Sequence, residues 1–142
     1  MAKNTYGIPF RVGTAGGALT AVALLTNIDA PGFSRDAIDA TTHDSAGGVA
    51  EYIPDGVLDI TEIQIEGDLI AGSTDDDRLI AAIVAGTLLD WEIDFKAASG
   101  TKTWSGADGF LTEYKPGPAP VKGAKQTFTA TLRPSGPITV AA

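Results

Sequence analysis

Short runs of alternating apolar and polar residues, separated by glycine and proline, recur along the chain and predict a mainly β protein. Residues 89–96 alternate without a fault and place Trp91, Ile93 and Phe95 on one face. Residues 126–133 repeat the same pattern. Both runs are typical of half-buried strands, whose apolar face contributes to a core.

Weaker strand patterns occupy much of the remaining chain. They cover residues 18–28, 34–41, 57–70, 102–104 with 110–114, and 138–140. Within 57–70 the apolar phase shifts by one residue near Thr61 and Glu62, which predicts a β-bulge at that point. Residues 1–17 are rich in glycine and small residues, so we expect an N-terminal arm or loop with at most a short strand at 8–12.

One segment has the signals of a helix, at about residues 74–85. Ser73 or Thr74 can cap its start, and three aspartates follow at the positive end of the helix dipole. Gly86 can end it in a left-handed conformation. The apolar residues recur at helical spacing, so one face should pack against a sheet.

These elements predict one domain, residues 1–142, with an antiparallel β-sandwich or barrel and one flanking helix. The chain has 44% hydrophobic and 20% charged residues, which excludes a disordered protein. A long loop at about 42–56 lacks periodicity. A loop of this length is uncommon in a compact domain unless it serves a function.

Charge is distributed unevenly. The net charge is −8, which opposes attraction to a phosphate backbone or an anionic membrane surface. Between Asp36 and Asp77 there is no Lys or Arg, and the carboxylates there are Asp36, Asp39, Asp44, Glu51, Asp55, Asp59, Glu62, Glu66, Asp68, Asp75, Asp76 and Asp77. The last third is net positive. Such a chain is either a dipolar monomer or one whose copies meet head to tail in rings that stack.

No pattern predicts an enzyme, a metal site or a cofactor. His43 is the single histidine and there is no cysteine, so the ligands of a conventional zinc site are missing. Three consecutive aspartates at 75–77 lack the spacing of a calcium loop and fit the helix end better. The longest apolar runs are too short to cross a bilayer as a helix.

The order of features around the long loop resembles the major tail tube proteins of long-tailed, lambda-like siphovirus bacteriophages. These features are the run 38–45 with its Thr-Thr-His-Asp-Ser sequence, then Gly47-Gly48, then an aromatic, a proline and a glycine within 51–57. The resemblance implies a structural virion protein of the tail, made in the host cytoplasm. Its copies would form stacked rings, hexameric in related phages, and genome ejection would pass through the tube.

The resemblance also implies roles for particular residues. The long loop would contact an adjacent subunit or ring through Thr42, His43, Asp44, Ser45, Glu51, Tyr52 and Asp55. Polar positions of the bent strand are the candidates for an acidic lumen, namely Asp59, Glu62, Gln64, Glu66 and Asp68. A rival lumen set is Asp90, Glu92 and Asp94. Such walls would repel DNA, which would pass without specific binding.

The partners implied are further copies of the chain, tail-tip and tail-terminator proteins and a tape-measure protein, with no membrane. Three other functions stay open at this stage. One is an extracellular carbohydrate- or surface-binding module with Trp104 and Tyr114 as its platform. Another is a secretion-system tube protein of the same architecture. The third, an acid hydrolase, would need two carboxylates with separated pKa values.

Overall fold

Ten strands and one α-helix form the part of the chain that the structure describes. The structure is a computed structural model and describes residues 6–119 and 121–141. The strands are β1 (Phe10–Thr14), β2 (Thr20–Ala21), β3 (Leu25–Asp29), β4 (Phe33–Asp39), β5 (Tyr52–Ile60), β6 (Ile63–Asp68), β7 (Leu89–Lys96), β8 (Thr101–Pro116), β9 (Thr127–Arg133) and β10 (Ile138–Ala141). The helix α1 spans Thr74–Ala85. The predicted mainly β class with a single helix is confirmed for these residues.

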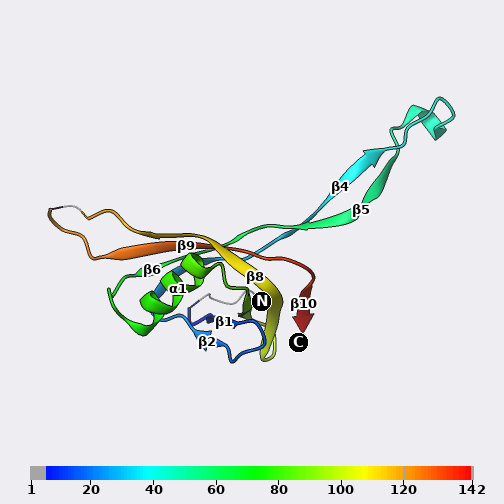
Figure 1. Cartoon of the computed structure of the whole chain (residues 1–142). Coiled ribbons are helices and arrows are strands. Elements are labelled where there is room, and N and C mark those ends of the chain that lie inside the picture. Colours follow the sequence, from blue (N-terminus) through cyan, green and yellow to red (C-terminus); the bar gives the residue numbers. More distant parts are fainter. Residues whose placement is uncertain (1–5, 120, 142) are drawn as a thin grey trace.

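The long strand β8 connects the two halves of the main sheet (Figure 1). The strand order is β2-β1-β7-β8-β9-β6-β3, and β10 pairs with β8 as well; all these pairs are antiparallel. The first part of β8 pairs with β7 and β10, and its last part pairs with β9. One half-sheet is therefore β2-β1-β7-β8-β10 and the other is β8-β9-β6-β3, as in a sandwich that shares a strand.

Apolar side chains from both half-sheets fill the core. The predicted alternation is seen in β7, where Leu89, Trp91 and Ile93 are buried, and again in β9. Strands β1 and β6 add to the same core. The buried hydrophobic residues are Phe10, Val12, Val22, Ile63, Ile65, Leu79, Leu89, Trp91, Ile93, Leu111, Phe128, Ala130 and Leu132.

Helix α1 has the ends that the sequence predicts. The Ser73 side chain accepts a hydrogen bond from the Asp76 backbone N–H at 3.2 Å, and Gly86 is left-handed with φ 66°. The aspartates of the first turn also fasten the helix to the sheet. Asp75 accepts from the backbone N–H of Ala23 at 2.9 Å, and Asp76 accepts from the Tyr114 hydroxyl at 2.5 Å. Helix-end electrostatics is thus one part of their role, and attachment of the helix is the other.

Four sequence predictions need correction. The short strand expected at 8–12 is present as β1, but residues 10–14 are not part of an arm, because β1 pairs with β7 and buries Phe10 and Val12; residues 1–5 lie outside the described residues. The run 18–28 is not one strand, since the chain leaves strand geometry between β2 and β3, where Leu24 has a φ of 62°. That conformation is uncommon for a residue other than glycine.

The long loop is shorter than predicted, because β5 begins at Tyr52 and the connection covers only residues 40–51. Pro54 lies inside β5, which a two-stranded ribbon tolerates because each strand has an open edge. The phase shift at Thr61 and Glu62 is not a bulge. It marks the point where the chain leaves the β4–β5 ribbon and enters the main sheet, so β6 is free to turn its own apolar face to the core.

Close packing between Trp91 and Gly106 generates a first prediction. The two residues face each other across β7 and β8, and a Cβ on Gly106 would lie 2.7 Å from the Trp91 indole nitrogen. Gly106→Ala should therefore lower the free energy of unfolding by about 1–3 kcal/mol through overpacking. Gly56→Ala is the matched control, because a Cβ there meets nothing within 4 Å. Chemical denaturation measures the free energy of unfolding of both variants. An equal loss of stability in the two variants would contradict the close packing of Gly106 on Trp91.

The bond between Tyr114 and Asp76 generates a second prediction. The Tyr114 hydroxyl and the Gly72 backbone N–H hold the pKa of Asp76 below its usual value. A lowered pKa in the folded state adds stability that is present above the usual carboxyl pKa of about 3.9 and is lost as the pH falls through the folded-state pKa. Tyr114→Phe should melt at a lower temperature than the parent at pH 7, and the gap should narrow below about pH 3. If the difference in melting temperature between Tyr114→Phe and the parent does not change with pH, the lost stability comes from packing and not from the hydrogen bond to Asp76.

Candidate assembly surfaces

The strands β4 and β5 form a ribbon that projects far from the body of the molecule (Figure 1). They pair only with each other, and every residue of β4 is exposed. The Thr61 backbone N–H donates to the Gly32 carbonyl at 3.0 Å, and the Gly32 backbone N–H donates to the Thr61 hydroxyl at 2.6 Å; these two bonds close the root of the ribbon. There, Phe33 contacts Trp104 with ring centroids 5.3 Å apart, so the ribbon is anchored to the sandwich at one end only.

The ribbon carries apolar side chains that the described chain leaves largely exposed. Of the large hydrophobic residues that are exposed, seven lie on residues 33–58, namely Phe33, Ile38, Val49, Tyr52, Ile53, Val57 and Leu58. Ile38 and Ile53 are direct cross-strand partners. A lone two-stranded hairpin is at best marginally stable in water. An apolar surface of this kind marks a contact site for another protein surface.

The tip of the ribbon has defined local structure. The Thr41 hydroxyl accepts a hydrogen bond from the Glu51 backbone N–H at 2.8 Å, and the Ser45 hydroxyl accepts one from the Thr42 backbone N–H at 3.0 Å. Hydrogen bonds from Thr41 lower the pKa of Asp39, which keeps that carboxylate charged. The tip therefore presents its acidic side chains from an ordered turn.

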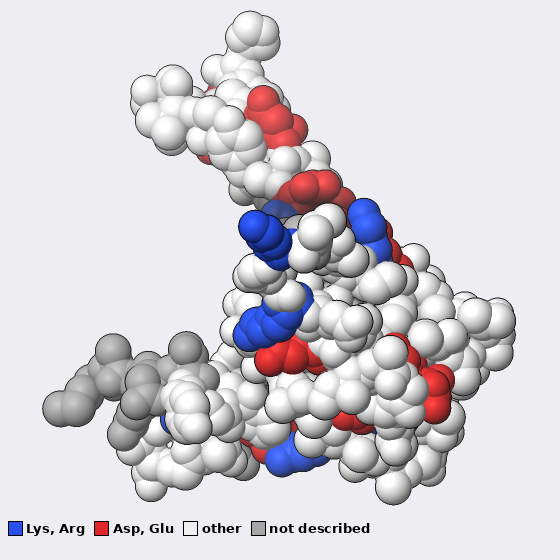
Figure 2. All heavy atoms as spheres, turned by 90° about the vertical axis from the view of Figure 1, so that its left-hand side faces the viewer, with Lys and Arg blue, Asp and Glu red and all other residues white. Residues whose placement is uncertain are grey.

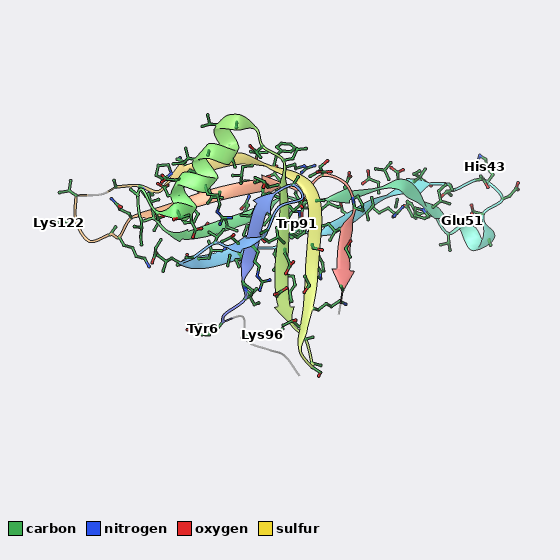
Figure 3. The ribbon with its side chains drawn as sticks, turned by 60° about the horizontal axis from the view of Figure 1, so that its bottom comes forward. Tyr6, His43, Glu51, Trp91, Lys96 and Lys122 are labelled. Carbon is green, nitrogen blue, oxygen red and sulfur yellow. The ribbon has the colours of Figure 1, made fainter. Side chains whose placement is uncertain are left out.

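The structure brings the predicted loop residues to this ribbon. Thr42, His43, Asp44 and Ser45 lie in the tip, and Glu51 lies where the tip meets β5 (Figure 3). Tyr52 and Asp55 belong to β5 itself. The loop prediction missed the exposed apolar residues of the strands, which alternate too weakly to stand out in the sequence.

The predicted lumen residues do not share one surface. Asp59 lies on the ribbon and Glu62 between β5 and β6, whereas Gln64, Glu66 and Asp68 occupy alternate positions of β6, opposite its buried face. Asp68 lies 2.9 Å from the Lys125 ammonium. The β6 residues pair with Thr131, Thr129 and Thr127 of β9, and Glu66 also pairs with Asn27 of β3. Together they form a polar outer face.

The rival acidic set is held by internal bonds. The Arg11 guanidinium lies 2.7 Å from Glu92 and 2.6 Å from Asp94. Burial opposes ionisation of Asp94, but hydrogen bonds from Arg11 and Thr103 outweigh it and lower its pKa. Asp90 accepts hydrogen bonds from the Gly16 and Asp108 backbone N–H groups. These carboxylates fasten β1, β7 and β8 together.

The aromatic platform expected for a carbohydrate-binding module is not formed. Trp104 is partly buried and contacts Phe33 and Phe95. Tyr114 stacks on Phe128, with ring centroids 5.6 Å apart, and donates its hydroxyl to Asp76. Among the residues that the structure describes, no group of three or more metal-binding side chains occurs and no helix is long and apolar enough to span a membrane.

Comparison with known families decides the identity of the fold. Residues 8–140 match the family described as phage tail tube protein. The chain belongs to this family. It is a structural tail tube protein of phage-type particles and not an enzyme. A comparison with curated proteins finds no match.

Several solved structures share the fold of this tail tube protein. The tail of an empty gene transfer agent particle with C6 symmetry has a TM-score of 0.77 at 17% identity, over 99% of this chain and 100% of that one. The sheath/tube terminator of an extracellular contractile injection system has a TM-score of 0.73 at 17% identity, over 100% and 98%. The SPP1 tail tube has a TM-score of 0.70 at 8% identity, over 94% and 76%.

The tail tube protein also leaves strand edges open at both ends of the half-sheet β8-β9-β6-β3. Among the described strands, β3 pairs only with β6. Residues 110–116 of β8 pair with β9 on one side and have no strand on the other. An open edge presents unpaired backbone groups that can pair with another chain. The polar outer face of β6 lies between these two edges.

Proposed function

We propose that this tail tube protein polymerises into stacked hexameric rings that form the tube of a long, lambda-like siphovirus tail. The observation that carries the proposal is the β4–β5 ribbon, whose exposed apolar side chains have no cover within their own chain. The C6 symmetry of the gene transfer agent tail supports rings of six. Contacts of the ribbon with neighbouring copies would bury the surface that one copy leaves in water.

In this proposal the two open edges of the half-sheet β8-β9-β6-β3 join between neighbours in a ring. Edge-to-edge pairing of β3 with residues 110–116 of β8 would close the half-sheets into a continuous barrel. The outer face of this half-sheet would then line the lumen. Gln64, Glu66 and Asp68 would belong to that lining, whereas Asp59 on the ribbon and Glu62 before β6 would lie outside its strands.

The lumen face is net negative on its strands. Its charged residues are Asp29, Glu66, Asp68, Glu113, Lys115 and Arg133, placed on one face by the cross-strand pairs and by the alternation of β9. Carboxylates that face a phosphate backbone repel it, and no counterion release favours binding. DNA would therefore pass through without adhering during genome ejection. Glu92 and Asp94 of the rival lumen set already form ion pairs with Arg11 of their own chain. This supports the β6 residues as the lining.

The tube needs partners at its ends and within it. We infer tail-tip and tail-terminator proteins at the two ends and a tape-measure protein in the lumen, with assembly in the host cytoplasm before the tail joins the virion. A secretion-system or contractile injection tube is the alternative with the same architecture, and the likeness to an injection-system terminator supports it. The two differ in whether DNA passes through the lumen.

Replacement of the tip tests the role of the ribbon. A variant with Asn-Gly in place of residues 42–49 should fold with an unchanged melting temperature, because no residue of the tip is buried. It should remain monomeric because it lacks the inter-subunit contact. Sedimentation velocity and negative-stain microscopy measure the outcome. Tubes at the yield of the parent chain would contradict the assigned role.

Charge reversal tests the lumen. Glu66→Lys places an ammonium on the proposed lining in every subunit, so tails should assemble but release DNA at least about tenfold more slowly. Asp77→Lys is the matched control, with the same change of charge at an exposed position of helix α1. Fluorescence of released DNA from purified particles gives both rates. Equal rates for the two variants would exclude the outer face of β6 as the lining.

A further inference from the structure

The two ends of the molecule carry opposite charge. Residues 36–59 of the ribbon contain six carboxylates and no Lys or Arg, namely Asp36, Asp39, Asp44, Glu51, Asp55 and Asp59. From Tyr114 to the end of the sequence there is no Asp or Glu, and the cations there are Lys115, Lys122, Lys125 and Arg133. Lys122 and Lys125 lie in the connection between β8 and β9, which we call the basic loop (residues 121–126).

The acidic tip and the basic loop point in opposite directions. In Figure 3, His43 and Glu51 lie at one extreme of the molecule and Lys122 lies at the other, with Trp91 between them. Figure 2 faces the end that carries the basic loop. Lys and Arg side chains lie along the middle of this face, and the outer part of the ribbon shows carboxylates. The tip and the basic loop of one chain therefore cannot meet each other.

The basic loop has the exposure of a contact surface. Val121 is fully exposed, at 101% relative to the free residue, and Lys122 beside it forms no ion pair with a described residue. The tip has a similar arrangement, with Val49 65% exposed and Glu51 two residues further. Each end thus combines an exposed valine with charge of one sign, and the signs are complementary.

We propose that the acidic tip of the β4–β5 ribbon docks on the basic loop of a second copy of the chain. Glu51 would lie opposite Lys122, and Val49 would cover Val121. The inference rests on the proposed polymerisation and names the surface that receives the ribbon. Such a head-to-tail contact uses two different patches, so it leaves one tip and one basic loop free at each step and can repeat from copy to copy. Opposite charges also select this register over tip-to-tip contact.

The partner is a second copy rather than a nucleic acid. The chain supplies the complementary acidic surface itself, on an ordered tip at the far end. The net charge of −8 opposes long-range attraction of DNA to a short loop with two lysines. Lys125 is in addition already 2.9 Å from Asp68, which leaves Lys122 as the main uncompensated charge of the loop.

Paired charge reversals test the contact. Lys122→Glu and Glu51→Lys should each raise the critical concentration for polymerisation at least about tenfold, because like charges then face each other. A chain with both substitutions should polymerise within about threefold of the parent, since the charges are complementary again. Lys102→Glu, on an exposed position of β8, is the control with the same change of charge as Lys122→Glu. Light scattering as a function of protein concentration gives the critical concentration of all four variants. Circular dichroism checks that each variant is folded.

Each outcome separates this inference from the proposed function. If the parent chain forms no polymer at any concentration, the proposed function fails. If the parent polymerises and Lys122→Glu behaves like Lys102→Glu, the docking is wrong while polymerisation stands. If both single variants polymerise poorly and the double variant does not recover polymerisation, the pairing of Glu51 with Lys122 is also wrong. Normal polymerisation of Lys122→Glu with weakened DNA retention on a filter would assign the loop to nucleic acid instead.

Discussion

The β4–β5 ribbon leaves large apolar side chains exposed to water in a single copy, and this is the constraint on which the rest of the structure depends. A ribbon pairs the backbone groups that face inward, but it leaves both faces and both outer edges in water. The cross-strand pair of Ile38 and Ile53 is exposed on such a ribbon. A surface that covers these side chains would stabilise the ribbon, and in the proposed tube that surface is another copy.

The sandwich provides the rigid base that this contact needs. Its core draws buried residues from both half-sheets, and β8 runs through both, so displacement of one half would disturb the other. The Arg11 contacts with Glu92 and Asp94 tie β1 to β7, and the Asp76–Tyr114 bond ties the helix to β8. The root of the ribbon rests on Trp104 at the mouth of the core.

Much of the fold could be predicted from the sequence because local patterns determine it. The faultless alternation at 89–96 and the capped helix at 74–85 both agree with the structure. The wrong predictions concern segments whose structure depends on pairing with strands that are distant in the sequence. The sequence allows a short strand at 8–12, but only the pairing of β1 with β7 makes it a strand of the core sheet rather than part of an arm. The phase shift at 61–62 was visible, but periodicity cannot distinguish a bulge from a change of sheet. For the site, composition located the acidic segment, whereas the placement of Asp59 on the ribbon and of Glu66 on the outer face of β6 depends on which strands β5 and β6 pair with.

The central claim is that this chain completes its β structure by association with identical copies. Negative-stain electron microscopy of the purified parent chain, across a range of protein concentrations, tests it most directly. If copies complete the β structure of one another, the images should show rings of six that stack into tubes with an open centre. A stable solitary particle at every concentration, with no ring or tube, would contradict it.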